Sequence, residues 1–317
     1  MSIQFTGDPM PGLTNYRHDR LLSRLTATLA VAALITTTGS AASADTGTPA
    51  RAPDASQITK AARDAASARP RSPQASASRA AVFGMFAIDT QGNLYSYAAD
   101  NAQVLAPREL LATDYGNVRT ASSTDDNGDG VADDTWVWTT DGGMSSSYGY
   151  VGGGWNIYDT VFSPGNLGGA PGYDVLGRDS SGLLWLYLGY GDGTLTDRRK
   201  VGGGWDAYTQ IVGKGDLTGD GWPDIVARDA SGVLWLYQGT GDPDAPFAAR
   251  TKIGSGWNAY DALVATGDMD LDGKADLIAR QPNGDLFFYK GTGNAAAPFE
   301  PKRNIGYGYQ NYRVMFS

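Results

Sequence analysis

From Val82 onward, short apolar segments alternate with turns rich in Gly and Asp, and the pattern recurs about every 50 residues. Trp155, Trp205 and Trp257 lie at equivalent places in GGGWNIYDTVF, GGGWDAYTQIV and GSGWNAYDALV, and Tyr309 takes this place in GYGYQNYRVMF. Between them lie GLLWLYLG, GVLWLYQG and GDLFFYKG. Such segments, separated by turns, predict about four strands per repeat. A four-stranded repeat of this length is typical of a β-propeller blade.

The two ends of the repeat region complement each other. AVFGMFAIDTQGNLYSY matches the second and third strands of a repeat, whereas the last segment, NYRVMFS, matches only a first strand. We therefore predict an all-β fold over residues 82–317, a β-propeller of five blades closed when the C-terminal strand joins the first blade. This closure removes an exposed sheet edge. The second repeat is short between Asp133 and Trp155, which predicts that it lacks most of one strand.

Acidic loops recur in register with the repeats. In GDMDLDGKADLIAR, Asp residues occupy loop positions one, three, five and nine, and Gly273 occupies position six. Oxygens at alternate positions of a tight loop, with Gly at position six, provide the spacing that calcium requires. Position twelve is Ala279 in a β-like run, so the loop predicts a calcium-binding β-hairpin and not an EF-hand.

Three copies of this loop predict about three calcium ions; the alternative for any one of them is a solvated acidic turn. A fourth copy has Asn166, Gly168 and Ala170 at the acidic positions and keeps only Asp174, so we predict that it binds no metal. The predicted ligand positions of the three loops are Asp125, Asn127, Asp129, Val131 and Asp133; Asp216, Thr218, Asp220, Trp222 and Asp224; and Asp268, Asp270, Asp272, Lys274 and Asp276.

Composition narrows the classes of function. The 317 residues carry a net charge of −9, which argues against nucleic acid as a partner, because nucleic-acid binding neutralises phosphates with Lys and Arg. The chain has no Cys, and its only His is His18 in the predicted leader. The mature chain would therefore lack the residues of Ser-His-Asp and Cys-His catalysis, of usual zinc sites and of disulfides.

The N-terminal part resembles an export signal. Arg17, Arg20 and Arg24 precede an apolar run from Leu25 to Ile35, and Ala42-Ser43-Ala44 forms an A-x-A cleavage signal. Because this run is too short for a membrane span, we predict a signal peptide over residues 1–44, cleaved after Ala44, and an extracellular mature protein without a membrane span. The alternative is an uncleaved anchor or a short buried helix. Residues 45–81, rich in Ala, Ser, Pro and Arg, predict a flexible linker, in which Ser56 to Ala68 could form a transient helix.

This chain resembles two protein families. The D-x-[DNT]-x-D-G-x-x-D loops before apolar strands resemble FG-GAP/VCBS repeats, known from integrin α-chain propellers and from secreted bacterial proteins. That resemblance implies a propeller, although the family usually forms seven blades. The GxGW-x-x-Y segments also resemble five-bladed tachylectin-type lectins, which bind N-acetylated sugars but do not have these calcium loops.

The first functional hypothesis is a multivalent carbohydrate-binding module for a glycan or a cell-wall polysaccharide. Aromatic faces pack against pyranose rings, neighbouring polar groups fix hydroxyls, and repeated sites raise avidity. The alternative for the same Trp residues is packing between blades. The candidate ligand-binding residues are Trp155, Asn156, Tyr158, Trp205, Asp206, Tyr208, Trp257, Asn258 and Tyr260.

Two further hypotheses have less support. A protein-binding or adhesion module follows only from analogy with integrin propellers, which is a weak argument for function. A glycoside hydrolase would use paired carboxylates. The mature chain has only two Glu, Glu109 and Glu300, and we expect both to be exposed. We therefore predict a binding protein without catalytic residues.

Overall fold

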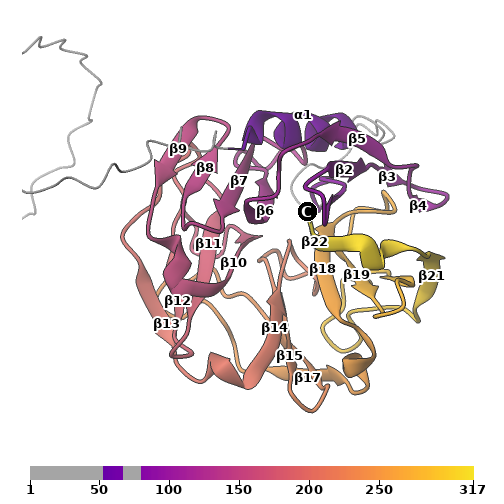
Figure 1. The fold of residues 1–317 in the computed structure, drawn as a ribbon. Helices are drawn as coiled ribbons and strands as arrows, with labels where there is room; N and C mark the ends of the chain where they lie inside the picture. The colour runs from indigo at the N-terminus through magenta and orange to yellow at the C-terminus, as the bar shows by residue number, and fades with distance from the viewer. Residues whose placement is uncertain (1–52, 67–79) are drawn as a thin grey trace, which may run out of the picture. The chain divides into compact units, whose positions relative to one another are not determined.

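The computed structural model describes residues 53–66 and 80–317. In this part of the chain five antiparallel sheets of four strands surround a central axis (Figure 1). The innermost strands β22, β6, β10, β14 and β18 contact one another in a ring. The predicted five-bladed propeller is confirmed.

Each blade is a short meander of four strands. From the axis outward the strands are β22 (Tyr312–Phe316), β1 (Met85–Asp89), β2 (Leu94–Tyr97) and β5 (Glu109–Ala112); β6 (Val118–Thr124), β7 (Asp134–Thr139), β8 (Met144–Ser146) and β9 (Gly149–Gly152); β10 (Tyr158–Gly165), β11 (Asp174–Asp179), β12 (Leu184–Tyr187) and β13 (Arg199–Gly202); β14 (Tyr208–Val212), β15 (Ile225–Asp229), β16 (Leu234–Tyr237) and β17 (Thr251–Gly254); and β18 (Ala262–Gly267), β19 (Asp276–Arg280), β20 (Leu286–Tyr289) and β21 (Arg303–Gly306).

Short elements join the strands. A hairpin of β3 (Ala99–Asp100) and β4 (Val104–Leu105) lies within the first blade. Turns of 3₁₀ helix precede four of the inner strands: η2 (Trp155–Ile157), η3 (Trp205–Ala207), η4 (Trp257–Ala259) and η5 (Tyr309–Asn311). The core lies between blades: Leu176 and Leu186 of the third blade pack in one cluster with Ile225 and Ala227 of the fourth.

The C-terminal strand closes the ring as the sequence predicts. β22 pairs with β1, with Ala87 opposite Met315. In the other blades a loop joins the first strand to the second. In this blade the first strand, β22, ends the chain, so no such loop exists, and the segment that leads into β1 lies in its place. Ala80 N donates to Gly273 O at 2.9 Å, and Asp268 N donates to Ala81 O at 2.9 Å. The entering segment therefore contacts the acidic loop of the fifth blade.

The second blade differs from its prediction. The sequence predicts that it lacks most of one strand, but it has all four. It is short because β8 has three residues and a two-residue turn links Ser146 to Gly149. The second repeat thus forms a third strand although its sequence is shorter than that of the other repeats.

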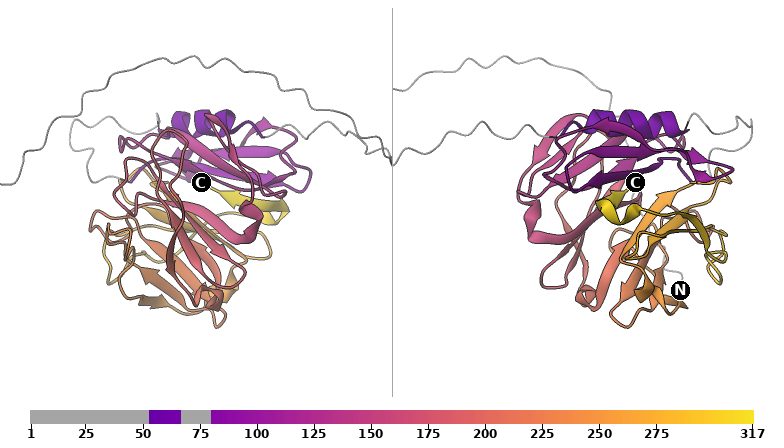
Figure 2. Two further views of the ribbon diagram at one scale, coloured as in Figure 1. Left: turned by 90° about the vertical axis from the view of Figure 1, so that its left-hand side faces the viewer. Right: turned by 45° about the vertical axis from the view of Figure 1, so that its right-hand side comes forward.

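A helix covers part of the second blade. α1 (Ala55–Ala66) lies in the stretch for which the sequence predicts a flexible linker, and for these residues that prediction is wrong (Figure 2). Its Ala55, Ile58, Ala62 and Ala65 are buried. Their spacing gives a helix one narrow apolar face, and Thr59 Oγ1 donates to Thr135 Oγ1 at 2.9 Å. The predicted signal peptide, its cleavage site and residues 45–52 and 67–79 lie outside the described residues.

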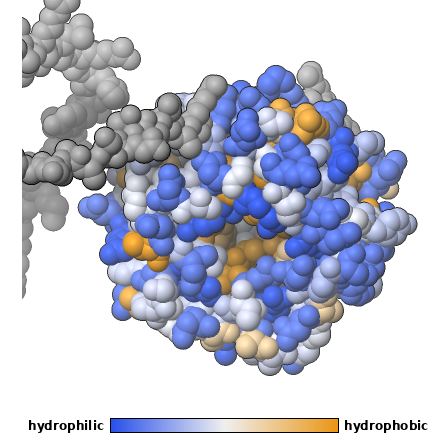
Figure 3. All heavy atoms as spheres, viewed as in Figure 1, coloured by the Kyte–Doolittle hydropathy of each residue, from blue (hydrophilic) through white to orange (hydrophobic). Residues whose placement is uncertain are grey.

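The axis is partly open and partly filled. A depression with apolar residues on its wall lies near the centre of the face in Figure 3. A cavity of about 70 Å³ at the axis is lined by Phe162, Lys214 and Phe316, among others. Lys214 is buried, and its Nζ donates to Ser122 Oγ at 2.9 Å. Burial lowers the pKa of Lys214 to about 7.

Candidate functional site

Each acidic loop joins the first and second strands of a blade, and the four loops share one backbone turn. Position four has positive φ in every copy: Gly128 (72°), Gly169 (71°), Gly219 (82°) and Leu271 (64°). For a residue with a Cβ this conformation costs about 1 kcal/mol or more, so Leu271 is held there by the rest of its loop.

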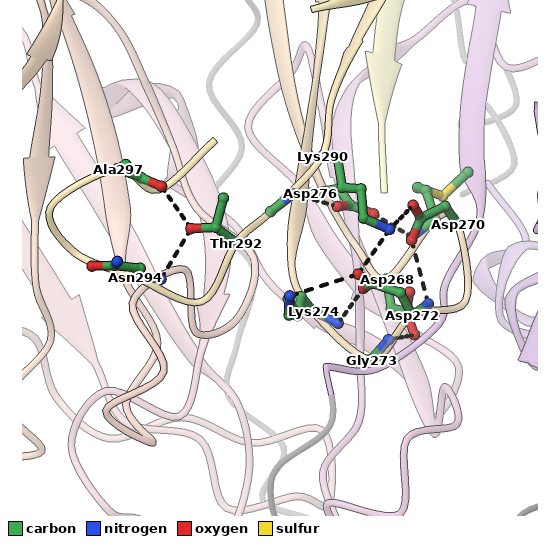
Figure 4. Close-up of polar contacts among 12 residues, drawn as sticks. Asp268, Asp270, Asp272, Gly273, Lys274, Asp276, Lys290, Thr292, Asn294 and Ala297 are labelled. Atoms are coloured by element: carbon green, nitrogen blue, oxygen red, sulfur yellow. Dashed lines mark hydrogen bonds and ion pairs between the residues drawn. The ribbon is translucent and has the colours of Figure 1, made fainter. Parts of the chain in front are cut away.

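The fifth-blade loop brings its acidic residues closest together (Figure 4). Asp268, Asp270 and Asp276 each present an oxygen, and these oxygens all lie within 4.8 Å of one another. It is the one such group found among residues 53–66 and 80–317. Several carboxylate oxygens converging on one point are the donor set that calcium prefers, so the residues present fit this ion.

The backbone holds these carboxylates in place. Asp276, fully buried, accepts from Gly291 N at 2.8 Å and from Met269 N at 2.9 Å. Asp268 Oδ2 accepts from Gly273 N at 2.8 Å. Burial raises the pKa of Asp276 to about 8, and the neighbouring Asp270 and Asp268 add to the shift. Since calcium binds the ionised carboxylate, ion binding and proton release would be coupled.

The fourth-blade loop is held in the same way. Asp216 accepts from Thr218 N at 2.9 Å and from Gly221 N at 2.8 Å. Asp224 accepts from Leu217 N and Gly239 N, both at 2.9 Å. Burial raises the pKa of Asp224 to about 7.

Positions five and seven also repeat in the three acidic loops. The carboxylate at position five accepts the backbone N–H of the residue at position seven at 2.9 Å in each loop. The pairs are Asp129 with Val131, Asp220 with Trp222, and Asp272 with Lys274.

The second-blade loop contains a residue outside the predicted ligand set. Asp125 Oδ2 accepts from Gly130 N at 2.8 Å, and Asp133 Oδ2 accepts from Asn127 N at 3.1 Å. The next residue, Asp134, is fully buried, and its Oδ1 accepts from Ser147 N at 2.6 Å. Two adjacent Asp residues thus share the role that Asp276 fills alone, and the Asp doublet is the sequence signal for this.

The third-blade loop keeps the framework without the acids. Asp174 accepts from Gly168 N at 2.7 Å and from Gly189 N at 3.0 Å. A Cβ on Gly168 would lie only 2.3 Å from Leu188 Cδ2. Leu188 therefore fills the space of a side chain at position three.

The repeated aromatic residues pack blades together. Trp155, Trp205 and Trp257 are 7–8% exposed. Their ring centroids lie 4.9, 4.7 and 4.6 Å from those of Tyr187, Tyr237 and Tyr289, respectively. The hydroxyls of Tyr158, Tyr208 and Tyr260 lie within 2.5–2.6 Å of the hydroxyls of the same three residues. The polar neighbours Asn156, Asp206 and Asn258 are exposed.

An arginine in each of three blades fixes the next 3₁₀ turn. Nη1 of Arg178, Arg228 and Arg280 donates to the carbonyl oxygens of Trp205, Trp257 and Tyr309 at 3.0, 3.1 and 3.0 Å. These arginines are not among the sequence-predicted residues, although their recurrence in GRD, ARD and ARQ is the signal that could have found them.

Two grooves open between blades. One, of about 440 Å³, lies between the second and third blades and is lined by Tyr148, Tyr150, Trp155, Asp192, Thr194 and Leu195, among others. The other, of about 350 Å³, lies between the fifth and first blades and is lined by Gln103, Leu105, Arg108, Tyr307 and Tyr309, among others. Trp155 and Tyr309 hold the same place in the repeat, so the grooves are equivalent.

One position in the repeat explains why the spaces between these blades, called wedges below, are open. Between the third and fourth blades, the ring centroids of Phe247 and Trp205 lie 6.1 Å apart. Between the fourth and fifth blades, those of Phe299 and Tyr289 lie 6.1 Å apart. Both Phe residues form a single β-bridge to a Gly after the third strand, and Leu195 forms the same bridge to Gly189. Leu105 lies at the corresponding hairpin of the first blade, opposite Ala99. Leu in place of Phe leaves the grooves unfilled.

Comparison with protein families agrees with this geometry. A model described as an FG-GAP-like repeat matches residues 173–227 and 216–279. The chain contains FG-GAP-like repeats. The matches begin just before β11 and end within β19, and they contain the acidic loops of the fourth and fifth blades. No curated protein sequence matches the chain, and the resemblance to tachylectin-type lectins stays a prediction.

Several solved structures match this chain in a structural comparison. They include AofleA from Arthrobotrys oligospora (10% identity, 74% of this chain and 72% of that chain, TM-score 0.41). A protein of unknown function from Bacteroides caccae matches with 10% identity over 72% and 73% of the two chains and a TM-score of 0.36. BBS1N in complex with ARL6DN matches with 13% identity over 70% and 69% and a TM-score of 0.37. Because these TM-scores are below 0.5, nothing about a ligand follows from them.

Within the described residues, no helix has the length and apolar character that crossing a membrane requires.

Proposed function

We propose that this chain is a secreted, calcium-stabilised propeller that binds carbohydrate in the two grooves between blades. The observation that carries the proposal is the pair of equivalent grooves, each of which combines exposed aromatic side chains with hydrogen-bonding groups. A pyranose ring presents apolar C–H faces and a rim of hydroxyls, and such a combination matches both.

The groove between the second and third blades offers the better platform. Tyr150, 68% exposed, lines this groove together with Trp155, Asp192 and Thr194. The groove between the fifth and first blades has Tyr307, 80% exposed, with Arg108 and Gln103. Two grooves on one chain would raise avidity for a polymer with repeated sugars.

The grooves revise which aromatic residues are candidates. Trp205 and Trp257 lie in wedges that Phe247 and Phe299 help to fill, so packing between blades accounts for them. Trp185 and Trp235 are also covered, because the guanidinium groups of Arg198 and Arg250 lie 4.2 and 4.1 Å above their rings. Trp155 remains a candidate because its edge lines an open groove.

Calcium has a structural role in this proposal. The acidic loops link the inner strand of a blade to the next strand, away from the groove-lining residues in sequence. An ion there replaces repulsion among carboxylates with coordination and so contributes to folding. Export is supported by the predicted signal peptide.

The glycoside hydrolase and protein-binding hypotheses are not supported by specific residues. Glu109 and Glu300 are exposed, and a general acid of a glycoside hydrolase needs an environment that raises its pKa. For a protein-binding role, the described residues offer no specific candidate outside the two grooves.

Binding of residues 45–317 to a glycan panel that includes chitin and peptidoglycan fragments, with excess calcium, tests the proposal. The affinity should fall at least about fivefold in Tyr150→Ala, since removal of a central aromatic contact typically costs more than about 1 kcal/mol. Tyr190→Ala is the matched control, because Tyr190 is 52% exposed and is not among the residues that line the groove. Absence of binding to every glycan, or equal loss in both variants, would overturn the proposal.

A further inference from the structure

A lysine reaches into the acidic loop of the fifth blade. Lys290 follows β20, and its Nζ lies 2.5 Å from Asp270 Oδ2 and 2.8 Å from Asp272 Oδ2 (Figure 4). All three side chains are at least partly buried. The ammonium group therefore takes two carboxylates that belong to the predicted ligand set, at positions three and five.

The equivalent residues of the neighbouring blades differ in chemistry. The residue after the third strand is Leu188 in the third blade, Gln238 in the fourth and Lys290 in the fifth. Leu188 fills the space beside Gly168, which is position three of its loop. Lys290 contacts Asp270, which is position three of its own loop. In these two blades the strand-end side chain thus decides what lies next to position three.

Charge gives Lys290 a specific consequence. The loop of the fifth blade has four carboxylates, Asp268, Asp270, Asp272 and Asp276, whereas those of the second and fourth blades have three at the same positions. Two ammonium groups face these four carboxylates: Lys290 lies at Asp270 and Asp272, and Lys274 Nζ lies 3.9 Å from Asp272 Oδ2. Because opposite charges at this distance in a partly buried site attract strongly, the contact offsets repulsion among the carboxylates when no metal is bound.

We propose that Lys290 is a tethered cation that holds the fifth-blade loop together without calcium and competes with calcium for Asp270 and Asp272. The inference rests on the proposed calcium binding. Calcium needs the same oxygens, so Lys290 must turn away when the ion enters. The fifth-blade loop is then the exchangeable site of the chain, and the fourth-blade loop, whose blade has Gln238 at the equivalent position, binds more tightly.

Exchanging the two residues tests this directly. Lys290→Gln gives the fifth blade the residue of the fourth, and Gln238→Lys does the reverse. Calcium titration calorimetry on chelator-treated residues 45–317 measures affinity, and thermal unfolding in EDTA measures the tether. Lys290→Gln should tighten the weakest calcium dissociation constant by about tenfold, because the competing ammonium group is removed. It should also lower the Tm in EDTA, because the charge-assisted contacts to Asp270 and Asp272 are lost.

The controls separate the outcomes. Gln238→Lys should weaken one tight site by a similar factor, and Lys290→Arg, which keeps the charge, should behave as the wild type in EDTA. Unchanged calcium affinity and unchanged Tm in Lys290→Gln, with calcium still binding, would overturn this inference alone. Absence of calcium binding by the wild type would overturn the calcium proposal as well.

Discussion

The loops of the third and fifth blades have the same backbone turn but opposite chemistry. In both, the Asp at position nine is fully buried and accepts two backbone N–H groups: Asp174 from Gly168 and Gly189, Asp276 from Met269 and Gly291. Only the fifth loop has acidic residues at positions one, three and five. In the third, Leu188 occupies the space beside position three.

This difference separates folding from metal binding. The Asp at position nine caps the turn, and the turn forms whether or not the other acids are present. The acids at positions one, three and five add charge that an ion or Lys290 must offset. A loop can therefore lack the acids at positions one, three and five while its blade keeps the fold.

Removing calcium should have the largest effect, and it should act on the acidic loops only. A site whose free ion concentration is about 1,000 times its Kd adds about 4 kcal/mol of stability. For a domain of this size that corresponds to a Tm shift of roughly 8–16 °C per site. Differential scanning calorimetry with calcium and with EDTA measures the shift. A Tm unchanged by EDTA would contradict the calcium role.

Alanine at position nine separates the two roles at the next level. Asp174→Ala and Asp276→Ala should both destabilise the protein in EDTA, because each leaves two buried backbone N–H groups without an acceptor at a cost of about 1–3 kcal/mol each. Only Asp276→Ala should also lose part of the Tm gain that calcium produces. Chemical unfolding of both variants with and without calcium measures this, and a calcium-dependent loss in Asp174→Ala would contradict the comparison.

The pH dependence without metal should show a smaller difference. Burial raises the pKa of Asp174 to about 6 and of Asp276 to about 8, above the ordinary value of 3.8. A raised carboxyl pKa means that the folded state binds the proton more tightly than the unfolded chain. This contribution is complete below pH about 4 and is lost as the pH rises through the folded pKa. These carboxyls therefore lower the Tm in EDTA as the pH rises from about 5 to about 9, while Lys214, whose pKa is lowered to about 7, acts in the opposite direction above about pH 7.

Asn variants assign that fall. Asp174→Asn should remove the part near pH 6, and Asp276→Asn the part near pH 8. With calcium present the upper part should also disappear, because the ion binds the ionised form. The same pH dependence of the Tm in EDTA in the wild type and in both Asn variants would contradict this assignment.

The sequence by itself determined the repeat, the five blades, the closure by β22 and the place of the acidic loops. These features follow from periodic patterns within about 50 residues. The tertiary structure decided the features that depend on contacts between distant residues. The apolar face of α1 is buried because α1 packs against β7. Lys290 contacts Asp270 because the pairing of β19 with β20 brings the end of β20 to the acidic loop. Whether the space between two blades is open depends on whether Leu or Phe lies beside the aromatic residue of the 3₁₀ turn there. A repeated sequence pattern specifies each blade. Contacts between strands or blades depend in addition on which side chain of the neighbouring element lies opposite.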